Sequence, residues 1–214
     1  MHKYNAVLLD LDGTVIDSAM GVFNGIEYAL CAYGIKTDRS SLYKYMGPPI
    51  RDTFADFLPN DEVERAVSLF REYYSSRGIN ECEIYEGIDD LIKELAQQGI
   101  KIALATSKPE MYARKILEHF CLDKYFAFIG GAGMDASLCT KTAVIQYVMA
   151  SKEMQNTLSV MVGDRASDLV AAEECKMDAI GVLYGYGTNA ELSACRNVYI
   201  ANDVQELRRY LIKE

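Results

Sequence analysis

The chain has 214 residues, half of them hydrophobic and a quarter charged, which is typical of a globular protein with one large domain or a domain carrying an insertion. Its formal net charge of -9 argues against a nucleic-acid polymer as partner, because no basic surface would neutralise the phosphates. No apolar run reaches the roughly 18 residues of a membrane span, so we expect no membrane segment and no membrane partner.

The first predicted strand is the run Ala6-Val7-Leu8-Leu9, which is short, apolar and partly β-branched. Runs of this kind are typical of strands buried inside a parallel sheet. Later segments with the same character are residues 100–106, 125–129, 158–163, 179–183 and 198–201.

Helical patterns lie between most of these strands. Ile88, Leu91, Ile92 and Leu95 follow the i, i+3, i+4, i+7 spacing, and Gly99 ends that helix. Further helices are predicted over residues 109–119, around 144–149 and around 169–175. This alternation predicts an α/β fold with a doubly wound, Rossmann-like parallel sheet and helices on both of its faces.

The stretch from residue 16 to residue 82 interrupts the alternation. It contains helical patterns and no convincing strand, and the loop Met46-Gly47-Pro48-Pro49 divides it. We therefore predict that residues 16–82 form a helical cap domain, inserted into a core domain made of residues 1–15 and 83–214.

Two carboxylates directly follow the first strand, in the sequence Asp10-Leu11-Asp12-Gly13-Thr14. On a continuing strand Asp10 and Asp12 would point to the same face, at the sheet edge where open α/β proteins bind ligands. Two like charges this close repel each other unless a cation or a proton is shared there. Acids also end strands as turn formers, but four fixed positions after a strand favour a site.

Thr106 and Ser107 follow the strand predicted over residues 100–106. Their hydroxyl groups and the N–H groups ahead of the next helix could hold an anion, and the alternative is a simple helix cap. Lys141 lies at the start of a later helix, where a cation opposes the helix dipole. It either meets a phosphate there or is a solvated surface lysine. Taken alone, each of these residues fits its simpler alternative better.

The segment Gly163-Asp164-Arg165-Ala166-Ser167-Asp168 follows the strand predicted over residues 158–163. Asp164 would lie in the loop and Asp168 in the first turn of the next helix, about one turn apart, so both could face one point above the sheet. A functional role is favoured for Asp164. For Asp168, helix capping and a metal role are weighed equally.

The six cysteines are scattered without a Cys-x-x-Cys pair, and a core of this size needs no disulfide framework. We therefore expect reduced thiols and a cytoplasmic location. Because the chain has only two histidines, a histidine-based triad or a histidine-rich zinc site has little support.

Together these motifs resemble the haloacid dehalogenase (HAD) superfamily of phosphohydrolases. Its four motifs stand in order here, and they are the Asp10 to Thr14 segment, Thr106, Lys141, and Gly163-Asp164 with Asp168. The match covers the whole chain, and the inserted helical segment resembles the family's C1-type cap. The segments Gly47-Pro48-Pro49, Thr106-Ser107-Lys108-Pro109 and 180–187 are most similar to phosphoglycolate phosphatase-like members, some of which are treated as 5′-nucleotidases.

The resemblance implies catalytic and metal-binding roles for the aspartates. Asp10 is the expected nucleophile, forming an aspartyl-phosphate, and Asp12 is the expected acid and base. Asp10, the backbone carbonyl of Asp12, and Asp164 are the expected Mg²⁺ ligands. Asp168 is expected to support them, through water or by orienting the lysine of the third motif.

The resemblance also implies how the substrate is held. Thr106, Ser107 and Lys141 are expected to bind the phosphoryl oxygens. The cap is expected to close over the site and to choose the substrate. Arg51, after the Gly47-Pro48-Pro49 loop, is our candidate for a substrate contact from the cap, although a plain surface arginine fits equally well.

Asp12 favours phosphate chemistry, because dehalogenases of this scaffold lack an acid two residues after the nucleophile. The expected function is a Mg²⁺-dependent phosphatase acting on a small phosphorylated metabolite, which could be phosphoglycolate, a nucleoside 5′-monophosphate or a sugar phosphate. A phosphomutase of the β-phosphoglucomutase kind and a non-catalytic binding protein are the alternatives. Both a monomer and a homodimer are open.

Overall fold

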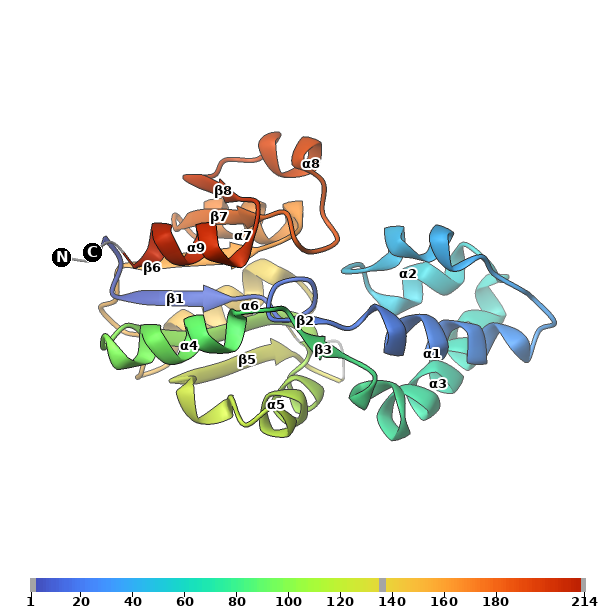
Figure 1. Cartoon of the computed structure of the whole chain (residues 1–214). Coiled ribbons are helices and arrows are strands. Elements are labelled where there is room, and N and C mark those ends of the chain that lie inside the picture. The colour runs from blue at the N-terminus through green and yellow to red at the C-terminus, as the bar shows by residue number, and fades with distance from the viewer. Residues whose placement is uncertain (1–2, 135–137, 213–214) are drawn as a thin grey trace. The chain divides into compact units, whose positions relative to one another are not determined.

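A six-stranded sheet with the strand order β5-β4-β1-β6-β7-β8 forms the centre of the larger part of the chain (Figure 1). The computed structural model describes residues 3–134 and 138–212. All neighbouring strands of this sheet run parallel, as the sequence predicts. The strands are β1 (Ala6–Leu9), β4 (Lys101–Pro109), β5 (Phe128–Ala132), β6 (Ser159–Gly163), β7 (Asp178–Val182) and β8 (Tyr199–Ala201).

The central strand β1 brings several loops to one edge of the sheet. Leu9, its last residue, is in register with Leu104 of β4 on one side and with Val162 of β6 on the other. β1 and β6 end within one residue of this level, whereas β4 continues to Pro109. Asp10, Thr106 and Asp164 therefore lie at the same edge of the sheet, where α/β proteins bind ligands.

Helices cover both faces of this sheet, which confirms the predicted fold class. The helices are α4 (Ile88–Gln97), α5 (Glu110–His119), α6 (Lys141–Ala150), α7 (Ala166–Glu174), α8 (Asn189–Ser193) and α9 (Val204–Leu211). Figure 1 shows α4 and α9 in front of the sheet and α6 and α7 behind it. Apolar side chains of α6 and α7, such as Val144, Val148 and Leu169, form one buried cluster with Leu8 and Ala103 of the sheet. This packing holds α6 and α7 against the sheet. Both helices begin at the sheet edge that carries the candidate site residues.

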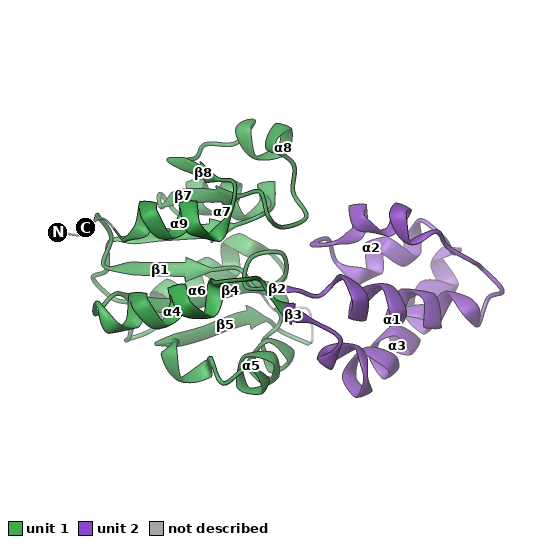
Figure 2. Cartoon of the chain, viewed as in Figure 1, with its two compact units in different colours: residues 1–16, 84–214 green, residues 17–83 purple. Residues whose placement is uncertain are grey.

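The structure divides the chain into residues 1–16 with 84–214 and residues 17–83 (Figure 2). Each division lies one residue later than the boundary expected from the sequence. The chain passes between the units through β2 (Ile16–Asp17) and β3 (Glu83–Ile84), which pair with each other. The expectation of no strand in residues 16–82 is wrong for β2, because two residues are too few to show a periodic pattern.

The smaller unit is helical apart from its share of this ribbon. It contains α1 (Ala19–Cys31), α2 (Ile50–Ala55) and α3 (Asn60–Ser76), with the short 3₁₀ helices η1 (Arg39–Tyr45) and η2 (Gly78–Asn80). Gly25 lets α1 approach α3, since a Cβ atom there would lie 2.8 Å from the ring of Phe70. Within the described ranges, no helix is both long and apolar enough to cross a membrane.

Several expected boundaries in the core are wrong, among them the ends of the strands expected over residues 100–106 and 125–129, which the structure extends to Pro109 and Ala132. The strand expected from residue 125 begins at Phe128, because Asp123–Tyr125 close a 3₁₀ turn (η3) in which the Tyr125 N–H donates to the Leu122 carbonyl. Pro109, expected in the first turn of a helix, instead ends β4 and caps α5. The later start of β5 arises at a turn, where a local hydrogen bond overrides the apolar pattern. The place of Pro109 is a shift of one residue at the start of a helix, where such boundaries commonly vary.

Candidate active site

Asp10 and Asp12 lie in the loop that follows β1. The Asp10 N–H still donates to the Val162 carbonyl of β6 at 2.9 Å, so Asp10 continues the sheet by one residue. Its carboxylate turns back and accepts the N–H of Leu11 at 2.7 Å. Gly13 then adopts a φ of +81°, and a Cβ atom at this position would lie 2.2 Å from the Oδ2 atom of Asp164. Glycine is therefore required here both by the backbone conformation and by the neighbouring carboxylate.

Lys141 holds two of the acids together. Its Nζ atom lies 2.8 Å from Oδ1 of Asp10 and 2.8 Å from Oδ1 of Asp168, and it donates to the Ala105 carbonyl at 3.2 Å. Its side chain is 5% exposed, so the alternative of a solvated surface lysine is wrong. Burial alone would lower the pKa of Lys141, but attraction by Asp10 and Asp168 outweighs burial and raises that pKa above its usual range. Lys141 is therefore a fixed cation in the centre of the site.

Asp164 and Asp168 lie at the end of β6 and in the first turn of α7. Asp164 is fully buried, and its Oδ2 accepts the N–H of Tyr186 at 2.8 Å. Asp168 accepts the N–H of Arg165 at 3.1 Å while its other oxygen contacts Lys141. The two alternatives weighed for Asp168 are thus compatible, because one carboxylate both caps α7 and faces the acid cluster.

The carboxylates of Asp10, Asp164 and Asp168 converge, with one oxygen of each within 4.8 Å of the others. Burial, with repulsion from Asp168, raises the pKa of Asp10 to about 6 although Lys141 counteracts it. Burial, with repulsion from Asp168 and Asp10, raises the pKa of Asp164 to about 8. Three carboxylates beside one lysine leave excess negative charge, which a divalent cation would compensate. The cluster offers only oxygen ligands, as Mg²⁺ prefers.

The Asp12 side chain faces a second lysine, which the sequence analysis did not identify as a site residue. Lys108 Nζ lies 2.9 Å from both carboxylate oxygens of Asp12. Lys108 belongs to the end of β4, beside Thr106. The signal for it was its place two residues after Thr106 at the carboxyl end of a strand, but a lone lysine after a strand is usually solvated.

Thr106 is buried, and its Oγ1 accepts the N–H of Lys108 at 3.2 Å. The N-cap of α5 is Pro109, so the alternative that Thr106 caps this helix is wrong. Ser107 is exposed next to it. The structure thus brings Thr106 and Ser107 to the same sheet edge as Asp10, and their phosphate-binding role stays a prediction.

A second group that the sequence analysis did not identify is the loop after β7. A Cβ atom on Gly185 would lie 2.1 Å from the Gly13 carbonyl oxygen, and one on Gly187 would lie 1.8 Å from the Asp164 carbonyl oxygen. The hydroxyl of Tyr184 donates to the Thr14 carbonyl at 3.1 Å. The two glycines, separated by one residue, were the available signal, because glycine marks close backbone approach.

Arg51 lies in the smaller unit, at the start of α2, and forms an ion pair with Glu64 of α3. Both side chains are mostly exposed, at 63% and 64%. The structure therefore gives Arg51 a local partner, and the substrate contact stays a prediction.

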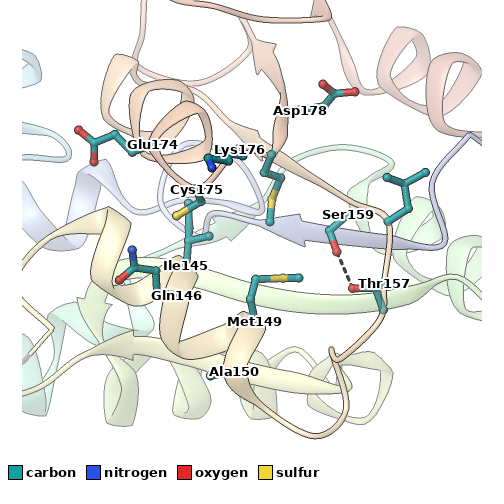
Figure 3. A pocket seen from close by; sticks show the side chains of 12 residues that line it. Ile145, Gln146, Met149, Ala150, Thr157, Ser159, Glu174, Cys175, Lys176 and Asp178 are labelled. Atoms are coloured by element: carbon teal, nitrogen blue, oxygen red, sulfur yellow. Dashed lines mark hydrogen bonds between the residues drawn. The ribbon is translucent and has the colours of Figure 1, made fainter.

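A cavity of about 710 Å³ lies at the opposite end of the sheet from the acids. It is lined by the end of α6, the start of β6 and the segment from the end of α7 into β7 (Figure 3). Among its lining residues, Thr157 and Ser159 hydrogen-bond to each other at 2.7 Å. Because these segments adjoin the amino ends of the strands, this cavity does not contain the acid cluster.

Comparison with known proteins identifies related families. The family model described as haloacid dehalogenase-like hydrolase matches residues 7–182. A 5′-nucleotidase from Pseudomonas aeruginosa is 33% identical over 212 residues, which are 98% of this chain and 96% of that protein. A phosphoglycolate phosphatase from Pseudomonas fluorescens is 27% identical over 211 residues, 94% of this chain and 77% of that protein.

A predicted phosphatase and a tyrosine-protein kinase are also similar to this chain. A crystal structure of a predicted phosphatase from Clostridium acetobutylicum superposes with a TM-score of 0.90 at 38% identity, covering 96% of this chain and 97% of that one. The tyrosine-protein kinase PtkA from Mycobacterium tuberculosis is 35% identical over 182 residues, 85% of this chain but 62% of that protein. Most of these names therefore describe the removal of phosphate groups.

Proposed function

The chain belongs to the haloacid dehalogenase-like hydrolase family as a phosphatase, and on that premise we propose that it hydrolyses a small phosphomonoester through an aspartyl-phosphate formed on Asp10. Family membership confirms the resemblance noted in the sequence. Phosphoglycolate and nucleoside 5′-monophosphates are the substrate classes that we propose, after the names of the relatives. The observation that carries the proposal is the convergence of Asp10, Asp164 and Asp168 around Lys141.

The acid cluster supports Mg²⁺ as the proposed cofactor. Burial, with repulsion from Asp168 and Asp10, raises the pKa of Asp164 to about 8, which supports a cation at this point. Asp10, Asp164 and the backbone carbonyl of Asp12 would hold the ion, with Asp168 supporting them. When bound, Mg²⁺ would neutralise the carboxylates and draw electron density from a phosphoryl oxygen.

In the proposed first step a carboxylate oxygen of Asp10 attacks phosphorus, and the bond between phosphorus and the leaving oxygen breaks. Asp12 gives its proton to that oxygen, so that the alcohol leaves neutral. In the second step Asp12 takes a proton from water, the water oxygen attacks phosphorus, and Asp10 is released as a carboxylate together with inorganic phosphate. Lys141 and Thr106 hold the phosphoryl oxygens and spread their charge in both steps.

The proposal is tested by phosphate release from a panel of phosphomonoesters containing 2-phosphoglycolate, AMP and glucose 6-phosphate, with Mg²⁺ or with a chelator. We expect release from at least one of them, only with Mg²⁺. Asp10→Asn should abolish release and leave the folded structure intact. Asp90→Asn, which alters an exposed acid on α4, is the matched control and should remain active. Undiminished activity of Asp10→Asn would sink the mechanism.

The same panel separates the two alternatives. A phosphomutase protects its aspartyl-phosphate from water, so release of free phosphate without a sugar acceptor argues against that function. A binding protein on this scaffold would release no phosphate from any member of the panel. Trapping of a labelled, acid-stable but hydroxylamine-sensitive adduct on the unchanged chain, absent from Asp10→Asn, would identify the nucleophile.

A further inference from the structure

Lys108 and Asp12 form a shielded ion pair beside the acid cluster. Nζ of Lys108 lies 2.9 Å from Oδ1 and 2.9 Å from Oδ2 of Asp12. The side chains are 7% and 18% exposed, so water screens the pair only weakly. An ammonium that contacts both oxygens fixes the direction of the carboxylate more firmly than a single contact does. The pair therefore restricts where the Asp12 carboxylate can point.

Both backbones of this pair are anchored. On one side, the Lys108 N–H donates to Thr106 Oγ1 at 3.2 Å, and Pro109 pairs in register with Ala132 of β5. On the other side, the Gly13 N–H donates to the Ile16 carbonyl at 2.8 Å, closing the loop that carries Asp12. Side chains mounted on such fixed segments hold their relative positions more accurately than side chains on unsupported loops.

The two lysines of the site, Lys141 and Lys108, contact different acids. Lys141 contacts Asp10, the proposed nucleophile, and Asp168, whereas Lys108 contacts Asp12, the proposed acid and base. Lys108 comes from the end of β4 and Lys141 from the start of α6. Each contacts a different group that takes part in the proposed reaction. A function for Lys108 should accordingly appear in proton transfer and not in formation of the acid cluster.

We propose that Lys108 is a positioning residue that orients the Asp12 carboxyl group toward the leaving oxygen of the substrate; this inference rests on the proposed function. Both Asp12 oxygens contact Lys108. After Asp12 has taken the proton of water in the second step, one of these oxygens carries that proton and directs it to the leaving oxygen of the next substrate, while the other oxygen keeps its contact with Lys108. Accurate placement of a reacting group accounts for a large part of many enzymatic rate enhancements.

The proposal predicts an effect that depends on the leaving group. An alkyl alcohol needs a proton as it departs, whereas p-nitrophenol departs readily as the anion. We therefore compare 2-phosphoglycolate and AMP with p-nitrophenyl phosphate. Lys108→Met should lower kcat on the alkyl substrates on the order of 10- to 100-fold more than on the aryl substrate, with little change in KM. This is less than the full contribution of general acid catalysis, because Asp12 itself remains. Lys108→Arg, which keeps the charge and the donors, should recover part of the loss.

Controls separate positioning from general damage. Lys115→Met removes an exposed lysine from α5. It should change neither the ratio of alkyl to aryl kcat nor the stability of the chain. In an Asp12→Asn background, Lys108→Met should no longer change the ratio of alkyl to aryl activity, because its target is gone. The proposal would be overturned if Lys108→Met lowered kcat equally on alkyl and aryl substrates. It would also be overturned if Lys108→Met still changed the ratio of alkyl to aryl activity in the Asp12→Asn background.

A second measurement does not depend on activity. The urea midpoints of Asp12→Asn, Lys108→Met and the double variant report whether the two side chains interact in the folded chain. We expect the shift of the double variant to be clearly smaller than the sum of the single shifts. Additive shifts would overturn the inference even if no panel substrate were cleaved, whereas non-additive shifts without any phosphate release would contradict only the proposed function.

Discussion

The ammonium of Lys141 lies 2.8 Å from the Oδ1 atom of Asp10, in a region that solvent barely reaches. This one cation therefore favours the ionised form of the proposed nucleophile and counteracts burial, which raises the pKa of Asp10. The same ammonium contacts Asp168, so its removal would leave two buried carboxylates without their partner. The stability of the core and the chemistry of the site depend on the same ion pairs.

Lys141→Met is expected to destabilise the chain by about 3–5 kcal/mol, the range found when one partner of a buried ion pair is removed. The free energy of unfolding in urea without divalent cations measures this. Part of the loss should be recovered when Asp168→Asn is added, because one of the unpaired charges is then removed. Lys115→Met is the exposed control. A loss below about 0.5 kcal/mol, as is usual for surface substitutions, would contradict the prediction.

The raised pKa values of Asp164 and Asp10 predict how stability depends on pH. In the folded chain they are about 8 and about 6, against a reference value of 3.8 for both, so the folded state binds more protons than the unfolded state between these limits. Without divalent cations, the contribution of these two groups to stability should therefore be greatest below the reference value of 3.8, and should fall steadily as the pH rises from there toward 8.

Mg²⁺ should reverse that trend, because it stabilises the ionised carboxylates. We expect the increase in Tm on addition of Mg²⁺ to be larger at pH 8 than at pH 5, measured by thermal unfolding with and without a chelator. In Asp164→Asn both the pH trend and the Mg²⁺ effect should shrink. An increase in Tm that is equal at both pH values would count against metal binding at these acids.

The sequence was most informative where the chemistry is local. Asp10 and Asp12 follow β1 directly, and Asp164 follows β6, so their convergence required only that parallel strands end at one edge. The environment of Lys141 and the pairing of Lys108 depend on partners far along the chain, which local patterns do not report. The two-residue strands β2 and β3 escaped prediction for a different reason, since they are too short to show alternation.

The loop after β7 leads to a further prediction, because its glycines leave room for Asp164. Gly187→Ala would place a Cβ atom 1.8 Å from the Asp164 carbonyl oxygen, so the backbone must move. We expect a stability loss of about 1–3 kcal/mol, typical of overpacking, together with weaker Mg²⁺ binding, because the Tyr186 N–H that holds Asp164 would move too. Isothermal titration with Mg²⁺ measures the second effect, and Asn189→Ala on the neighbouring α8 is the control. Unchanged Mg²⁺ affinity would show that this loop does not position Asp164.

Two variants can distinguish the ion pair of Arg51 from its proposed contact with the substrate. Arg51 and Glu64 are both mostly exposed, so their pair should contribute at most about 1 kcal/mol to stability. Arg51→Ala and Glu64→Ala break the same pair, but only the first removes the arginine. If Arg51 contacts the substrate, Arg51→Ala should raise KM for the best panel substrate severalfold, while Glu64→Ala should leave KM unchanged or lower it by freeing the guanidinium. Equal KM values in both variants would show that Arg51 only pairs with Glu64, and the choice of substrate would then have to come from other residues.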